Sequence, residues 1–137
     1  MPQLPWLVKT LEPNNPTGQL LNKAQVIEIL EQTKQDALVV VDEAYIEFAD
    51  EGTAPEIDIN NPNVIRFRTF SKAYGMAGAR IGYAIAEKNL AVSFNKVRNH
   101  FGVNRIAQAG ACAALADQAY LKNIQQKVIA ARGKINE

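Results

Sequence analysis

The apolar residues form short continuous runs in the first two-thirds of the chain and helix-period patterns towards its end. The run Ala37–Val41 is uninterrupted, which is typical of a strand buried on both faces of a parallel sheet. Further strands are predicted at 6–11, 64–68 and 80–86. Asn22 precedes apolar positions spaced for a helix, and it has the side chain of a helix cap. Later helices are predicted at about 88–98, 104–116 and 118–136.

Strands that alternate with helices predict an α/β fold with a mainly parallel sheet flanked by helices. Polar residues lie beside each strand end: Asn15, Asp42 and Lys72 after three strands, and Arg80 at the start of the last. Taken singly, a turn, a helix cap or a surface Ser-Lys is the more common explanation of such residues. Binding sites in α/β sheets nevertheless gather at the carboxyl ends of strands, so the four are candidates for one site.

Lys72 has neighbours suited to a phosphate-bearing aldehyde cofactor. Its amine can close a Schiff base with an aldehyde. Thr69 and Ser71 supply hydroxyls, and Arg80 supplies a guanidinium that can bind a phosphate. These four residues therefore favour covalent attachment of a phosphorylated cofactor.

Three other side chains match the ring of pyridoxal 5'-phosphate. A carboxylate such as Asp42 can keep a pyridine nitrogen protonated, which makes the ring an electron sink. Asn15 and Tyr45 can donate hydrogen bonds to its phenolic oxygen. Pyridoxal phosphate is therefore the predicted cofactor, and no metal site is predicted.

Three motifs carry a resemblance to a known family. They are Asn-Asn-Pro-Thr-Gly at 14–18, Asp-Glu-Ala-Tyr at 42–45, and Thr-Phe-Ser-Lys-Ala-Tyr-Gly-Met-Ala-Gly-Ala-Arg-Ile-Gly-Tyr at 69–83. In order and spacing they resemble the fold-type-I, class I/II aminotransferases, most of all the histidinol-phosphate aminotransferase branch. The resemblance covers the chain from about residue 12 to its end. It implies that residues 1–137 are the central part of the large, cofactor-binding domain, with the helix from about 118 leading towards a small domain.

The resemblance also implies a role for each candidate residue. Lys72 is the Schiff-base lysine, and it moves the proton between the substrate α-carbon and the cofactor. The other implied ligands are Asp42 at the pyridinium nitrogen, Asn15 and Tyr45 at the phenolic oxygen, and Thr69, Ser71 and Arg80 at the phosphate. Arg98 and Asn104 also fall at recurrent positions of the family, but a helix-surface arginine and an N-cap asparagine explain them equally well.

The substrate is less well defined than the cofactor. The resemblance implies transamination between an amino acid, with L-histidinol phosphate as the first candidate, and a 2-oxo acid, as in histidine biosynthesis. Residues 98–104 differ from the Arg-x-Pro-Phe-Asn-Val-Asn form common in that branch. A phosphothreonine decarboxylase-like enzyme and another amino acid aminotransferase therefore stay open. His100, the sole histidine, is either a substrate contact or, more commonly for such a residue, a loop histidine with no catalytic duty.

Both ends of the chain look cut, since it opens without a clear first element and closes within a helical pattern. Family members have an N-terminal cofactor loop, an aromatic residue that stacks on the ring, and a C-terminal arginine for the substrate carboxylate. None of these segments is recognisable here. We therefore expect little or no activity from the 137 residues alone, and an inactive fragment is a further alternative. The resemblance implies a homodimer for a full-length parent.

Composition gives no sign of several other classes of protein. The formal net charge is +1 and 21% of residues are charged, so nothing indicates binding to nucleic acid or to an anionic membrane. No apolar run reaches membrane-spanning length and no signal peptide is recognisable, which makes a cytoplasmic location the expectation. Cys112 lies among small residues and is predicted to be buried.

A P-loop ATPase is the rival that motif matching suggests. The apolar run that ends in Asp42-Glu43 resembles a Walker B strand. The chain has no Gly-x-x-x-x-Gly-Lys-Ser/Thr sequence, however, and Lys72 lacks the glycine loop that would bind a triphosphate. The sequence therefore disfavours this class.

Overall fold

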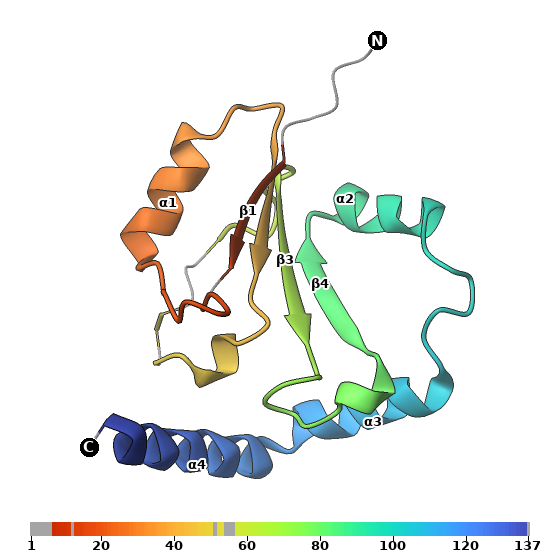
Figure 1. Ribbon diagram of the computed structural model, residues 1–137. Helices are drawn as coiled ribbons and strands as arrows, with labels where there is room; N and C mark the ends of the chain where they lie inside the picture. Colours follow the sequence, from red (N-terminus) through yellow and green to blue (C-terminus); the bar gives the residue numbers. More distant parts are fainter. Residues whose placement is uncertain (1–6, 12, 51, 54–56, 137) are drawn as a thin grey trace. The chain divides into compact units, whose positions relative to one another are not determined.

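The computed structural model describes residues 7–11, 13–50, 52–53 and 57–136 (Figure 1). The described residues form two compact units. The first comprises those up to Arg68 together with Tyr83–Asn99, and the second comprises Thr69–Gly82 together with those from His100 onward. Among the residues described, no helix is both long and apolar enough to cross a membrane.

A four-stranded sheet with the order β1-β2-β3-β4 is the main framework of the protein. Its strands are β1 (Leu7–Leu11), β2 (Leu38–Asp42), β3 (Val64–Thr69) and β4 (Gly82–Ala86). β2 pairs in parallel with both β1 and β3, and the arrow of β4 points the opposite way in Figure 1. The prediction of a mainly parallel α/β sheet is therefore confirmed.

The core of the first unit lies against one face of β2 and β3. Val39 and Val64 face each other in register, and together with Val41 they form a buried cluster. Leu30 of α1 (Lys23–Gln32) and Ile57 pack against this cluster. Because alternate residues of a strand point to opposite faces, Val39 and Val41 share one face of β2. α1 therefore covers the face of the sheet that these valines form.

Local capping sets where α1 begins. The Asn22 side chain accepts a hydrogen bond from the Gln25 N–H at 3.0 Å, and the Gln25 side chain accepts one from the Asn22 N–H at 2.9 Å. This reciprocal capping box satisfies two N–H groups that have no partner within the helix. The predicted cap at Asn22 is confirmed.

The other helices of the first unit are short. They are the 3₁₀ turn η1 (Ile46–Phe48), the helix α2 (Lys88–Ser93) and the 3₁₀ turn η3 (Phe94–Lys96). The helix predicted at 88–98 is therefore two shorter elements. The Glu87 carboxylate caps α2 by accepting from the N–H groups of Asn89 and Leu90. Phe94 packs edge-on against Phe67 of β3, with ring centroids 6.1 Å apart.

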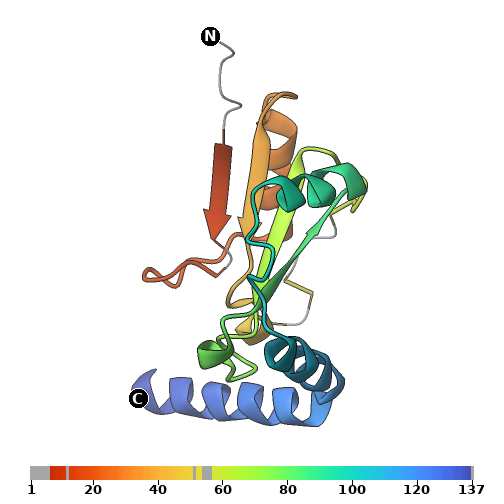
Figure 2. The ribbon, with the colours of Figure 1, turned by 90° about the vertical axis from the view of Figure 1, so that its right-hand side faces the viewer.

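Two long helices dominate the second unit, which Figure 2 shows from a second direction. They are α3 (Arg105–Ala116) and α4 (Gln118–Asn136), and both match their predicted bounds closely. The Asn104 side chain caps α3 by accepting from the Ala107 N–H at 2.7 Å. Asn104 is therefore an N-cap residue, one of the two interpretations that the sequence allowed.

The prediction that Cys112 is buried is wrong, because its side chain is exposed. Ala107 and Ala111, four residues apart, form the buried face of α3. Successive residues are turned by about 100° around a helix, so Cys112 points away from the direction of Ala111. A run of small residues does not by itself show which of them face inward.

An ionic cluster is buried where β2 ends. Glu43 has no exposed surface, and its Oε1 accepts from Arg66 Nε at 3.0 Å and Nη2 at 2.6 Å. Its Oε2 accepts from Arg68 Nε at 2.8 Å. We call Glu43, Arg66 and Arg68 the Glu43 clamp. Burial of charge is unfavourable without such partners, so the clamp satisfies a carboxylate that water cannot reach.

The pKa values of two groups in or beside the clamp, Arg68 and Glu47, are shifted. Burial alone would lower the pKa of Arg68, but its hydrogen bonds and attraction to Glu43, with a further contribution from Tyr83, raise it. Burial raises the pKa of the Glu47 carboxyl above its ordinary 4.5, and repulsion from Glu43 adds to this. A hydrogen bond to its own backbone and, to a smaller extent, attraction to Arg68 offset only part of the increase. Two guanidinium groups thus satisfy the Glu43 carboxylate, whereas burial has the largest effect on the Glu47 carboxyl.

We predict opposite effects for the same substitution at these two sites. Glu43→Gln removes the charge that two guanidinium groups need, and we expect it to lower the free energy of unfolding by about 3 kcal/mol or more. Glu47→Gln should raise the free energy of unfolding at pH 7. The unfolded state releases the Glu47 proton at a lower pH than the folded state does, which favours unfolding once the pH exceeds 4.5.

Denaturant unfolding of both variants across pH 4 to 8 measures this. The Glu47→Gln advantage should disappear below pH 4.5, where the native carboxyl is protonated in both states. Equal effects of the two substitutions at pH 7 would contradict the assignment.

Candidate active site

The structure brings Asn15 and Tyr45 into direct contact, although 30 residues separate them. Asn15 Nδ2 donates to Tyr45 Oη at 2.8 Å. Asn15 lies in a turn closed by the Gly18 N–H, which donates to the Asn14 carbonyl at 2.8 Å, and Gly18 has the positive φ of 69°. An amide has two N–H donors and a hydroxyl has one, so this pair can donate to an acceptor that reaches both.

Asp42 is the last residue of β2 and is paired in register with Leu11 and Phe67. Its side chain is half-buried, and Oδ1 accepts from the Ala44 N–H at 3.2 Å. Strand alternation places Asp42 on the face opposite Val41. Asp42 therefore presents a carboxylate, steadied by one backbone N–H, at the carboxyl end of a central strand.

The remaining candidates belong to the second unit. Thr69 is the last residue of β3, and Ser71, Lys72 and Arg80 lie in the segment 70–81 between β3 and β4, which we call the Lys72 loop. Ser71 N–H donates to Thr69 Oγ1 at 3.1 Å, and Gly75 N–H donates to the Lys72 carbonyl at 2.9 Å. Phe70 makes two backbone hydrogen bonds that close the loop. Its N–H donates to the Ile81 carbonyl, and its carbonyl accepts from the Met76 N–H. The loop is therefore a hydrogen-bonded structure of its own.

Lys72 is exposed, whereas three apolar or aromatic side chains near it in sequence are buried. Phe70, Ala73 and Tyr74 are 3%, 1% and 8% exposed, and the rings of Phe70 and Tyr74 are 5.1 Å apart. A buried aromatic base thus anchors the loop and leaves the amine at its surface. This is the arrangement that a lysine needs if it is to react with a bound aldehyde.

The prediction that Arg80 opens the last strand is wrong. β4 begins at Gly82, and Arg80 ends the 3₁₀ turn η2 (Ala77–Ala79) with φ 53° and ψ 51°. A strand needs extended backbone, and this left-handed conformation is incompatible with it. Arg80 Nη1 donates to the Ala77 carbonyl at 2.9 Å, so the guanidinium remains part of the Lys72 loop.

Helices α3 and α4 support this loop through residues that the sequence reasoning did not single out. A Cβ added to Gly110 of α3 would lie 2.9 Å from Met76 Cε, and one added to Gly75 would lie 3.0 Å from Tyr120 Oη of α4. Gly75 also has the positive φ of 68°. In the sequence, Gly110 could be noticed as a glycine inside a predicted helix and Gly75 as a glycine three residues after Lys72. Neither feature identifies the residue that each glycine approaches.

The candidates therefore form two sets. The first unit holds Asn15, Asp42 and Tyr45, and the second holds Thr69, Ser71, Lys72 and Arg80. His100 is exposed and contacts the ring of Phe101 edge-on at 6.3 Å, and Arg98 Nε donates to Asn95 Oδ1 at 2.6 Å. Within the described part of the chain, no three His, Cys, Asp or Glu residues are grouped so that they could hold a metal ion.

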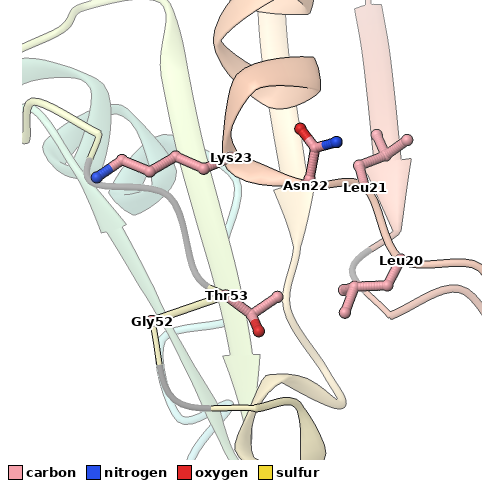
Figure 3. A pocket seen from close by; sticks show the side chains of 6 residues that line it. All are labelled: Leu20, Leu21, Asn22, Lys23, Gly52 and Thr53. Carbon is pink, nitrogen blue, oxygen red and sulfur yellow. The ribbon is translucent and has the colours of Figure 1, made fainter.

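The first unit also has a surface pocket, and its lining residues differ from both sets of candidates (Figure 3). It is lined by Leu20, Leu21, Asn22, Lys23, Gly52 and Thr53. None of these is a candidate residue. The pocket therefore adds nothing to the donor sets described above.

Comparison with known proteins assigns the chain to a family. The family model described as aminotransferase class I and II matches residues 6–136. The chain belongs to this family. The family resemblance that the three motifs carry is thus confirmed, and members of this family are enzymes.

Individual relatives agree with this family. Histidinol-phosphate aminotransferase 2 of Carboxydothermus hydrogenoformans is 44% identical over 86% of the chain and 34% of its own length. An aromatic amino acid aminotransferase of Rhodococcus jostii is 41% identical over 96% of the chain and 37% of its own length. The chain thus spans about a third of the length of these relatives.

A solved structure confirms the fold class. Histidinol-phosphate aminotransferase from Sinorhizobium meliloti, solved in complex with pyridoxal-5'-phosphate, has a TM-score of 0.90 and 47% identity. The match covers 94% of this chain and 36% of that one. The chain therefore has the predicted fold-type-I architecture.

Gly75 provides a test of the loop's support. We predict that Gly75→Ala lowers the free energy of unfolding by about 1–2 kcal/mol, because the residue has a positive φ and its Cβ would crowd Tyr120. Gly78→Ala is the matched control, since a Cβ there meets nothing within 4 Å and φ is not positive. Thermal unfolding measures both, and equal stability of the two variants would contradict the role of Gly75.

Proposed function

We propose that the protein uses pyridoxal 5'-phosphate to move an amino group between an amino acid and a 2-oxo acid. The observation that carries this proposal is an exposed amine, Lys72, on a loop with a buried base that also holds two hydroxyls and a guanidinium. Membership of the aminotransferase family supports it, as does the similar structure solved with this cofactor.

The residues present fit the cofactor by their chemistry. In the first unit, the Asp42 carboxylate suits a protonated ring nitrogen, and the Asn15–Tyr45 pair suits a phenolic oxygen. In the second unit, Lys72 suits the aldehyde, while Thr69, Ser71 and Arg80 suit a phosphate. We propose that each set supplies ligands for pyridoxal phosphate, as the family resemblance implies.

Each residue then has a defined task. When bound, the cofactor supplies an electron sink for the electron pair left at the substrate α-carbon. Lys72 holds the aldehyde carbon covalently until the amino group of the substrate displaces it. The released amine of Lys72 then takes the α-proton and delivers it to the former aldehyde carbon. Asp42 holds the proton on the ring nitrogen, which keeps the ring able to accept the electron pair.

The same residues complete the cycle in reverse. In this second half, which starts from a 2-oxo acid, Lys72 would return the proton to the α-carbon of that acid and would then hold the aldehyde again. The reaction is therefore a ping-pong exchange in which no net oxidation takes place.

Loss of Lys72 is the sharpest test. In the full-length protein, we predict that Lys72→Ala lowers turnover at least about a hundredfold, the lower end of what a positioned acid–base group contributes. After borohydride reduction, peptide mass spectrometry should find the cofactor on the Lys72 peptide of the native protein and on no lysine of the variant.

Lys127→Ala is the matched control for this experiment. Lys127 is an exposed lysine on α4, and its removal should leave both turnover and cofactor attachment unchanged. Attached cofactor or native turnover in the Lys72→Ala variant would refute the proposal.

For the amino donor we propose L-histidinol phosphate, because the relatives named for it reach 44–46% identity. The 41% match to an aromatic amino acid aminotransferase supports aromatic amino acids as the second candidate. We also include in the proposal a homodimeric, cytoplasmic enzyme, as the family resemblance and the composition imply.

Steady-state kinetics separate the two donors. We predict that kcat/KM for L-histidinol phosphate exceeds that for L-phenylalanine and L-tyrosine at least about a hundredfold, because a site that binds a phosphate group discriminates against donors without one. Assays with a common 2-oxo acid at equal enzyme concentration measure this. The reverse ranking would favour the aromatic amino acid activity.

A further inference from the structure

Glu43 uses every polar group that it has. Its N–H donates to the Phe67 carbonyl at 2.8 Å, and its carbonyl accepts from the Ile46 N–H at 3.2 Å. Both carboxylate oxygens accept from the guanidinium groups of Arg66 and Arg68. Five hydrogen bonds thus fix one residue that has no exposed surface.

The Glu43 clamp lies on the other side of the strand from Asp42. Val39 and Val41 are buried on one face of β2, and strand alternation places the side chain of Glu43 on that same face. Arg66 is paired in register with Val41, which puts it on the face of Glu43 too. The clamp therefore cannot share a ligand with Asp42 directly, and any influence on Asp42 must pass through the backbone.

The backbone connects the clamp closely to the ring-binding residues. Asp42 directly precedes Glu43, and its carboxylate accepts from the N–H of Ala44, which directly follows Glu43. Tyr45, which contacts Asn15, is one residue further on. The short segment that carries the carboxylate and the hydroxyl is therefore held at its midpoint by Glu43.

Stability alone is a weak reason for such a clamp. Removing a carboxylate from water is unfavourable, and apolar side chains of similar volume often stabilise a fold as well as a buried ion pair does. Apolar contacts are non-directional, however, whereas hydrogen bonds between guanidinium and carboxylate groups set both distance and angle. The clamp is thus better suited to setting position than to adding stability.

We propose that Glu43, held by Arg66 and Arg68, is a positioning residue that sets where Asp42 and Tyr45 meet the ring of the cofactor. This inference rests on the proposed function. It assigns the second residue of the Asp-Glu-Ala-Tyr motif a duty distinct from that of its neighbours. A displaced carboxylate would hold the ring proton less well, and the electron pair from the α-carbon would be stabilised less.

The experiment compares three variants of the full-length, cofactor-loaded enzyme. Glu43→Gln breaks the clamp. The triple variant Glu43→Leu/Arg66→Met/Arg68→Met replaces the clamp with apolar side chains, so it still tests the proposal if Glu43→Gln fails to fold. Glu47→Gln, the same chemical change four residues on, is the control and should keep native kcat.

We expect both clamp variants to lose kcat by roughly tenfold to a hundredfold per cofactor-loaded molecule, with KM for the amino acid changed less than about threefold. The pH at which the visible absorption band of the bound cofactor changes should differ from that of the native enzyme. The triple variant should recover thermal stability without recovering kcat. Native kcat and a native band in a folded triple variant would overturn the proposal, because a purely structural role predicts that result.

A second readout does not depend on the cofactor. Hydrogen exchange of the apo protein should show faster exchange at the amides of Ala44 and Ile46 in Glu43→Gln than in Glu47→Gln. A native protein that neither binds the cofactor nor transaminates would refute the proposed function, and the exchange data would still test the clamp. Unchanged exchange in an active enzyme would refute the clamp alone.

Discussion

A buried carboxylate between two arginines determines how the central strands of this protein end. Without Arg66 and Arg68, the fully enclosed Glu43 would be strongly unfavourable, because water cannot reach it. The N–H of the same residue continues the pairing of β2 with β3 beyond the last residue of β2. The clamp thus joins two strands where their apolar runs give way to polar residues. Every candidate ligand of the first unit is within a few residues of that junction or bonded to one that is.

The second unit holds a long, flexible lysine side chain on a rigid backbone. Lysine side chains lose considerable conformational freedom when they are fixed, so a reactive lysine benefits from a rigid backbone beneath it. Phe70, Ala73 and Tyr74 bury the base of the loop, and hydrogen bonds close it at both ends. Close approach to α3 and α4 at Gly110 and Gly75 completes the support. The exposed amine and the buried base are two parts of one arrangement.

The features that the sequence predicted correctly depend on neighbours in the chain. The apolar run of β2, the capping box at Asn22 and the cap at Asn104 are all local, so their signals lie within a few residues. The predictions for Arg80 and Cys112 were wrong for a different reason. The backbone angles of Arg80 and the helix face of Cys112 determine their places, and residue type alone reveals neither. The pairing of Glu43 with Arg66 and Arg68 joins residues more than twenty positions apart. Only the strand register brings them together, so the motif could be recognised while the duty of its second residue could not.

Strand alternation explains how two adjacent acids can have unlike duties. Asp42 and Glu43 carry the same kind of acidic group and are consecutive in the chain, yet the pleat directs them to opposite faces of β2. Asp42 is half-buried and accepts one backbone hydrogen bond, whereas Glu43 is enclosed and accepts three from guanidinium groups. An exchange of the two residues would place the shorter side chain opposite the arginines, where its reach falls short by one methylene group. The order Asp before Glu is therefore a geometric requirement of this strand end, and chemical similarity between the two acids does not make them interchangeable.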